Sequence, residues 1–140
     1  MTWKLEARGW KLDGNAERTI KSFRDFEVYQ LAYLLAMEVF RMTKKFPPDE
    51  RYSLTRQLRD SSRSIPGNIA EGWSKRRYEN VFKRQLTDAI GSSDETTVWL
   101  DMARDCEYCS TTEHEVFIKR YGSVGKMLQR LIDNWRTFER

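Results

Sequence analysis

One stretch, Gln57–Trp73, constrains the fold of this chain more than any other part of it. Its apolar and small residues recur at steps of three and four: Leu58, Ser61, Ser62, Ile65, Ile69 and Trp73. This spacing places them on one side of a helix. Pro66 falls inside the pattern. Because proline has no backbone N–H and clashes with the carbonyl one turn earlier, we expect the helix to kink near residues 62–65.

Three more segments show the same helical spacing, at about residues 24–45, 78–106 and 112–138. The helix that contains Pro66 is expected to begin near Asp49 or Glu50 and to weaken or end at Gly72. The last helix has Ser110, Thr111 and Thr112 as candidate N-caps, and Glu115 lies at the capping-box spacing from Thr112. Small residues around Gly91 predict a close approach to the helix that contains Pro66.

These segments predict an all-α fold, an antiparallel up-down-up-down four-helix bundle over residues 24–140 with an N-terminal arm over residues 1–23. The first helix has a broad apolar stripe, and five further apolar residues widen it. The stripe contains Phe26, Tyr29, Ala32, Tyr33, Ala36, Met37 and Phe40, and the residues that widen it are Val28, Leu31, Leu35, Val39 and Met42. That width exceeds what one core requires, so it favours association with another chain. Trp3 and Trp10 in the arm are expected to dock either on the same domain or on a neighbouring subunit.

Composition narrows the class of protein. Of 140 residues, 39% are hydrophobic and 33% are charged, and no apolar run approaches the ~20 residues that span a bilayer. The first residues lack the apolar centre of a secretory signal. We therefore expect a cytoplasmic protein that makes no membrane contact and whose two cysteines, Cys106 and Cys109, stay reduced.

Charge is unevenly distributed along the chain. Residues 75–84 carry five bases and one acid, whereas residues 85–110 carry six acids and one base. The basic residues predicted to bind nucleic acid are Arg56, Arg59, Arg63, Lys75, Arg76 and Arg77. Arginine pairs well with phosphate, and Tyr52, Trp73 and Tyr78 are near enough to stack on unpaired bases, although Trp73 also continues the apolar stripe. The alternatives are an ordinary solvated helix surface, or pairing with the acidic segment of another copy.

Asn68, Glu71 and Glu95 form a predicted structural polar site. Asn68 is placed to satisfy backbone groups that Pro66 leaves free, and Glu71 and Glu95 are expected to pair with Arg59 or Arg63 across the bundle. Acid–base chemistry by these carboxylates is the less favoured interpretation.

The pair Cys106-x-x-Cys109 with His114 is one ligand short of a structural zinc site, and it lacks the context of a redox motif. No nucleophile-and-base pair and no phosphate-binding loop is present. We expect no catalytic residues, no metal and no cofactor.

Four segments carry a family resemblance: FRDFEVYQLA (Phe23–Ala32), FPPDERYSLTRQLR (Phe46–Arg59), SIPGNIAEGW (Ser64–Trp73) and GSSDE (Gly91–Glu95). In their order and spacing the chain resembles the bacterial family named for the 23S rRNA intervening sequence, also called four helix bundle proteins. It departs from that family at Asp60-Ser61-Ser62 and in its longer N-terminal arm.

The resemblance implies an antiparallel four-helix bundle that assembles as a homopentamer and has no established enzymatic activity. It also implies a link to accessory proteins of diversity-generating retroelements, which bind reverse transcriptase and nucleic acid. We therefore expect a non-enzymatic homo-oligomer that binds RNA or DNA, with a reverse transcriptase or another protein as a further partner. The alternative is a scaffolding oligomer without direct nucleic-acid binding.

Overall fold

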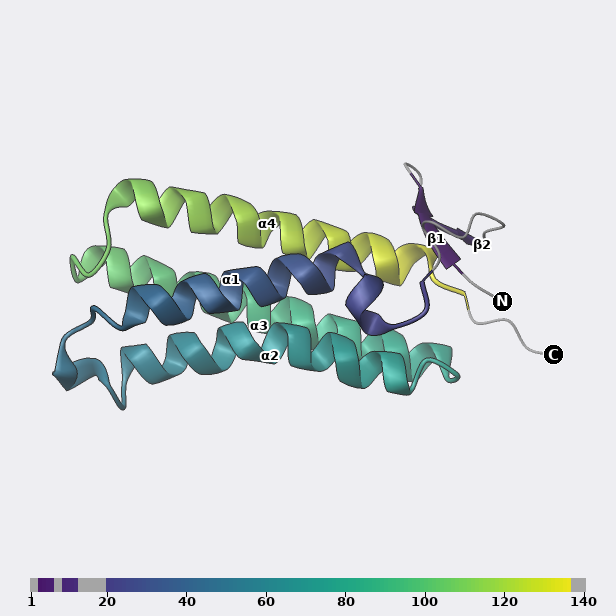
Figure 1. Cartoon of the computed structure of the whole chain (residues 1–140), viewed down its shortest axis with the longest axis horizontal. Coiled ribbons are helices and arrows are strands. Elements are labelled where there is room, and N and C mark those ends of the chain that lie inside the picture. The colour runs from purple at the N-terminus through teal and green to yellow at the C-terminus, as the bar shows by residue number, and fades with distance from the viewer. Residues whose placement is uncertain (1–2, 7–8, 13–19, 137–140) are drawn as a thin grey trace.

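The computed structural model describes the backbone of residues 3–6 and 9–12 and all of residues 20–136. Four helices run in alternating directions along one long axis (Figure 1): α1 (Glu27–Thr43), α2 (Leu54–Ser74), α3 (Glu79–Asp105) and α4 (Thr111–Asn134). Each helix packs against the next one in the chain, and α4 returns to α1. This confirms the predicted antiparallel four-helix bundle.

A short hairpin lies in the N-terminal arm. Strands β1 (Trp3–Glu6) and β2 (Gly9–Leu12) pair antiparallel, and β2 contacts α4 near the C-terminal end of that helix (Figure 1). The predicted docking of the Trp3 and Trp10 side chains lies outside the described residues, and so does the predicted helix end at Phe138.

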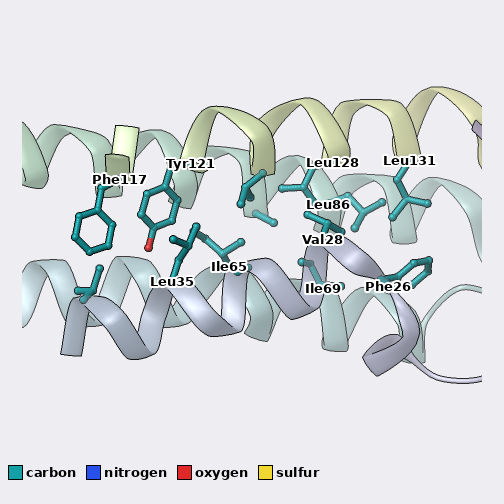
Figure 2. Close-up of a cluster of buried hydrophobic side chains, with 14 of the residues drawn as sticks. Phe26, Val28, Leu35, Ile65, Ile69, Leu86, Phe117, Tyr121, Leu128 and Leu131 are labelled. Atoms are coloured by element: carbon teal, nitrogen blue, oxygen red, sulfur yellow. The ribbon is translucent and has the colours of Figure 1, made fainter. Parts of the chain in front are cut away.

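The core runs the length of the bundle and receives side chains from all four helices (Figure 2). Phe26, Leu35, Ile65, Leu86 and Leu128 are completely buried. The sequence misplaced the centre of the stripe on the first helix. The innermost residues of α1 are Val28, Ala32, Leu35 and Val39. Ala32 belongs to the predicted stripe, whereas the other three were predicted only to widen it. The rings of Phe117 and Tyr121 point from α4 toward this side of α1 (Figure 2).

Helix ends differ from the prediction by a few residues. The predicted first helix divides into a 3-10 turn, η2 (Phe23–Asp25), and α1, because Phe26 adopts an extended backbone with ψ of 126°. A second 3-10 turn, η3 (Pro48–Glu50), precedes α2. Ser110 caps α4 in a capping box with Glu113, two residues before the predicted box. The pairs Ser110–Glu113 and Thr112–Glu115 both have the capping-box spacing, and α4 begins with the first pair.

The close approach between α2 and α3 that was predicted at Gly91 occurs at Gly72 instead. Gly72 lies buried in the last turn of α2, which ends two residues later at Ser74, and a Cβ there would stand 2.9 Å from Cβ of Gln85 on α3. Gly91 was expected to provide close contact, yet it is exposed and no atom lies within 4 Å of a Cβ added there. α3 buries Ala89 and Ser93, each two residues from Gly91, so Gly91 faces the opposite way.

α2 continues as an α-helix through Pro66. None of the helices described is long and apolar enough to cross a membrane.

Candidate nucleic-acid interface

Arg59 and Arg63 gather with Lys44 around the ring of Phe40, and we call these four residues the Phe40 cluster. The guanidinium carbons of Arg59 and Arg63 lie 4.8 and 5.8 Å from the ring centroid, and Nζ of Lys44 lies 4.8 Å from it. Phe40 and Lys44 come from the end of α1, whereas both arginines come from α2. The cluster therefore forms only when the two helices pack together.

Arg59 is fixed in this cluster by a hydrogen bond. Its Nε donates to Oγ1 of Thr43 at 2.8 Å, and the Thr43 hydroxyl donates to the carbonyl of Phe40 at 3.0 Å. In the part of the chain that the structure describes, none of the three cations of the cluster forms an ion pair with a carboxylate. Three uncompensated positive charges on one face create a field that attracts polyanions.

The other predicted basic residues lie elsewhere. Arg56 pairs with Asp60 at 3.6 Å and Lys75 pairs with Glu71 at 3.0 Å, so these two charges are locally compensated. Arg76 and Arg77 lie beyond the far end of α2. At a rise of 1.5 Å per residue, this is about 25 Å along the helix from the Phe40 cluster. The six predicted bases thus form two separate groups.

At the far end of α2, each arginine covers an aromatic ring. The guanidinium of Arg76 lies 4.0 Å from the Trp73 ring and donates to the Trp73 carbonyl at 3.0 Å. That of Arg77 lies 6.0 Å from the ring of Tyr78. Trp73 itself is only partly exposed and contacts Phe26 with its ring centroid 5.3 Å away, so it belongs largely to the core. Tyr78 is the exposed ring of this group.

Further aromatic side chains lie on α1 between the two groups, and the sequence assigned them to the core. Tyr29 and Tyr33 have ring centroids 6.1 Å apart, and Tyr33 is 54% exposed. Their spacing from Phe40 places all three on the flank of α1 that faces α2. Exposed aromatic rings beside unpaired cations are the features with which proteins bind unpaired bases and the phosphates between them.

Polar side chains link α2 to α3 in a row that we call the polar seam. Asn68 donates to Oγ of Ser64 at 3.0 Å and accepts from Nε2 of Gln85 at 2.7 Å, and the same Gln85 nitrogen lies 3.2 Å from Oε2 of Glu71. Oγ of Ser64 lies 2.8 Å from Oγ of Ser92. The seam therefore aligns two helices.

The seam differs from the predicted polar site in three respects. Asn68 bonds to side chains rather than to the carbonyl that Pro66 leaves free. Glu71 pairs with Lys75 instead of Arg59 or Arg63. Glu95 lies outside the seam and is exposed, because α3 turns Thr96 toward α2 and successive helical residues diverge by about 100°.

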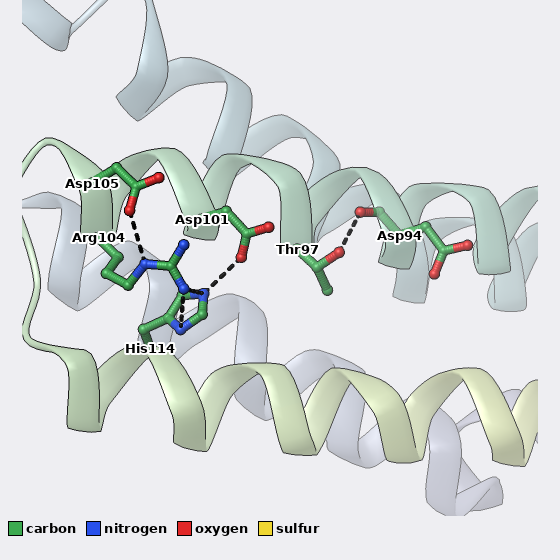
Figure 3. A network of polar contacts seen from close by, with 6 residues as sticks. All are labelled: Asp94, Thr97, Asp101, Arg104, Asp105 and His114. Carbon is green, nitrogen blue, oxygen red and sulfur yellow. Dashed lines mark hydrogen bonds and ion pairs between the residues drawn. The ribbon is translucent and has the colours of Figure 1, made fainter.

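His114 joins α3 to α4 near one end of the bundle (Figure 3). Its ring is nearly buried, and Nε2 lies 2.7 Å from Oδ1 of Asp101. Nη1 of Arg104 stands 3.4 Å from both ring nitrogens. Because the in-plane directions of the two ring nitrogens diverge, an atom at equal distance from both lies over the ring face, so Arg104 stacks on the imidazole. The arrangement is a structural contact.

The two cysteines lie between α3 and α4. Cys106 is exposed, and burial raises the pKa of the partly buried Cys109 thiol above its ordinary value. A raised pKa keeps this thiol protonated at neutral pH and makes it a weak nucleophile. Among the described residues, no group of three His, Cys, Asp or Glu side chains is arranged to hold a metal ion.

Comparison with known proteins supports the fold. A family profile described as 23S rRNA-intervening sequence protein matches residues 24–130, well over half of the chain. One similar solved structure is a protein of unknown function from the S23 ribosomal protein family of Bacteroides thetaiotaomicron, with a TM-score of 0.69 and 21% identity. The match covers 76% of this chain and 96% of that one, and at this identity it shows a shared fold. No curated protein matches the chain.

Proposed function

The chain belongs to the 23S rRNA-intervening sequence protein family, and we propose that it is a non-enzymatic homo-oligomer, a pentamer, that binds RNA through the outer face of α1 and α2. The observation that carries this proposal is the Phe40 cluster. Three cations lie around one ring, one of them is fixed by a hydrogen bond, and none is paired with a carboxylate in the described part of the chain.

RNA with unpaired bases fits this face better than a regular duplex does. Arg59 and Arg63 supply flat guanidinium groups that pair with phosphate oxygens, while the exposed ring of Tyr33 offers a surface on which a base can stack. Arg76 and Arg77 extend the positive surface toward the opposite end of α2. In a ring of identical subunits this face repeats around the axis, so the summed field exceeds that of one chain with its net charge of +4.

The test is RNA affinity measured at several salt concentrations by fluorescence anisotropy, using a labelled ribosomal RNA fragment that contains a single-stranded loop. The variant Lys44→Glu with Arg63→Glu reverses two charges of the cluster and leaves the Arg59–Thr43 hydrogen bond in place. We expect at least a tenfold loss of affinity at low salt and a shallower salt dependence, because each lost phosphate contact lowers the slope of log affinity against log salt by about 0.7 to 0.9.

A matched control carries the same change in net charge on another face. Arg41→Glu with Arg130→Glu alters exposed residues beside the hollows between α1 and α4, and it should retain most of the affinity. If the cluster variant binds as tightly as the unmodified protein at every salt concentration, the Phe40 cluster does not bind RNA. If the unmodified oligomer ignores RNA even at low salt, a scaffolding role replaces RNA binding.

A further inference from the structure

The outer side of α3 carries a regular row of exposed residues. Starting at Val81 and moving by alternating steps of three and four residues, every position as far as Met102 is exposed. We call this row the α3 outer row. Three apolar residues lie toward its ends, Val81, Val98 and Met102, which are 41%, 46% and 47% exposed, and Arg84 follows Val81. Its middle holds Asp88 and Glu95, with no ion-pair partner among the described residues.

A row of the same length lies on the outer side of α4. From Thr112 to Asp133, the same alternating steps again reach only exposed residues, and we call these the α4 outer row. Its middle is basic, since Lys119 and Lys126 lie there, and neither forms an ion pair within the described part of the chain. The two rows are thus opposite in charge at their centres.

The fourth of seven positions in each row is a glycine, Gly91 in α3 and Gly122 in α4. No atom lies within 4 Å of a Cβ added to either one, so packing within the chain requires neither glycine. A glycine inside a helix costs about 1 kcal/mol relative to alanine. Two such exposed glycines at matching positions allow the backbones of two helices from different molecules to approach closely.

We propose that the α3 outer row of one copy packs antiparallel against the α4 outer row of a second copy, with Gly91 opposite Gly122. In this register Asp88 lies opposite Lys126 and Glu95 lies opposite Lys119, so both acids at the centre of the α3 outer row meet a base. Toward the ends, Glu115 and Asp133 of the α4 outer row lie opposite Val98 and Val81. The antiparallel direction follows from symmetry. When copies are related by rotation about an axis along the bundle, every α4 runs opposite to every α3.

This inference rests on the proposed homo-oligomer and identifies the contact that builds it. The contact is heterologous, because it joins two different surfaces of the same chain, and such contacts form a ring when the rotation between copies closes. It leaves the Phe40 cluster uncovered, since that cluster lies on α1 and α2. Self-association and RNA binding therefore use separate surfaces and are separable by mutation.

The test is the molar mass of the full chain by size-exclusion chromatography with light scattering. Asp88→Lys with Glu95→Lys places like charges across the contact, and we expect the mass to fall to that of a single chain. Lys119→Glu with Lys126→Glu should have the same effect. Combining all four substitutions exchanges the charges between the rows, and the mass should return to that of the unmodified oligomer.

Two further measurements keep the outcome decisive. Asp49→Lys with Asp60→Lys makes the same change in net charge at exposed positions outside both rows, and it should leave the mass unchanged. Circular dichroism must show equal helix content in all variants. An α3 variant that keeps the full mass overturns this contact but leaves the oligomer itself intact. The contact is also overturned if the double variants dissociate and the variant with all four substitutions does not regain the full mass. If the unmodified protein is a monomer, both the proposed homo-oligomer and the contact between the two outer rows are overturned. RNA affinity is measured separately and tests only the proposed RNA binding.

Discussion

At Gly72 the backbone of α2 comes so close to α3 that a single methyl group has no room. A Cβ there would stand 2.9 Å from Cβ of Gln85 and 3.2 Å from the ring of Phe82. Gly67 lies in the same helix, is exposed and meets no atom within 4 Å. Comparing alanine substitutions at the two positions therefore separates the cost of crowding against α3 from the general effect of glycine on helix stability.

We expect Gly72→Ala to lower the free energy of unfolding by about 1 to 3 kcal/mol, because overpacking outweighs the gain in helix propensity. Gly67→Ala should raise it by about 0.5 to 1 kcal/mol. Urea denaturation at one fixed protein concentration measures both, since unfolding of an oligomer depends on concentration. Equal stability of the two variants would show that α2 and α3 can separate at Gly72 without cost.

Between elements, the polar seam fixes how α2 sits against α3. Asn68 is partly buried and uses both ends of its amide, one toward Ser64 and one toward Gln85. Asn68→Ala removes both hydrogen bonds and leaves Gln85 with only the exposed Glu71. We expect a loss of about 1 to 2 kcal/mol in the free energy of unfolding.

The matched control for this loss is Asn80→Ala, an exposed asparagine in the first turn of α3. Substitution at such a surface position should change stability by less than about 0.5 kcal/mol. Thermal denaturation followed by circular dichroism compares the two. A variant at Asn68 as stable as the control would mean that the seam selects helix alignment without contributing net stability.

The existence of all four helices was readable from the sequence, and so was the rotation of α2, whose predicted stripe is buried from Leu58 to Ile69. The rotation of α1 was readable only in part. Steps of three and four residues locate all four helices, because that spacing is the geometry of the helix itself. In α1, however, two apolar stripes overlap, and the choice between Tyr33 and Leu35 for the core depends on what α4 presents opposite. Gly91 was given a packing role because small residues surround it, but only its neighbours Ala89 and Ser93 are buried.

The candidate site was predictable only in the part that lies on one helix. Arg59 and Arg63 stand out because they share a face of α2, so their spacing in the sequence is sufficient. Phe40 and Lys44 complete the cluster from α1, and the sequence gives no distance between helices. Arg56 and Lys75 are paired with Asp60 and Glu71, each four residues away, so the spacing in the sequence already carried the signal that these two charges are compensated.

On the scale of the whole molecule, Tyr121 links core packing to the response to pH. Its side chain is 1% exposed at the centre of the bundle, and its hydroxyl has no hydrogen-bond partner among the described residues (Figure 2). Burial raises the pKa of this phenol far above its ordinary value. In the unfolded chain a tyrosine ionises near pH 10. The contribution of the neutral phenol to stability is therefore complete below about pH 10 and is lost as the pH rises above it.

Tyr121→Phe removes an unpaired buried hydroxyl, so we expect the free energy of unfolding to rise by about 1 kcal/mol at pH 7. The variant should also lose less stability than the unmodified protein between about pH 9 and pH 11, because phenylalanine has no proton to release on unfolding. Tyr33→Phe is the control, since that ring is 54% exposed and its loss of a hydroxyl should change little. Urea denaturation across this pH range measures all three proteins. A Tyr121→Phe protein less stable at pH 7 than the unmodified chain would show that the hydroxyl is paired in solution, and that the centre of the bundle is more polar than its side chains indicate.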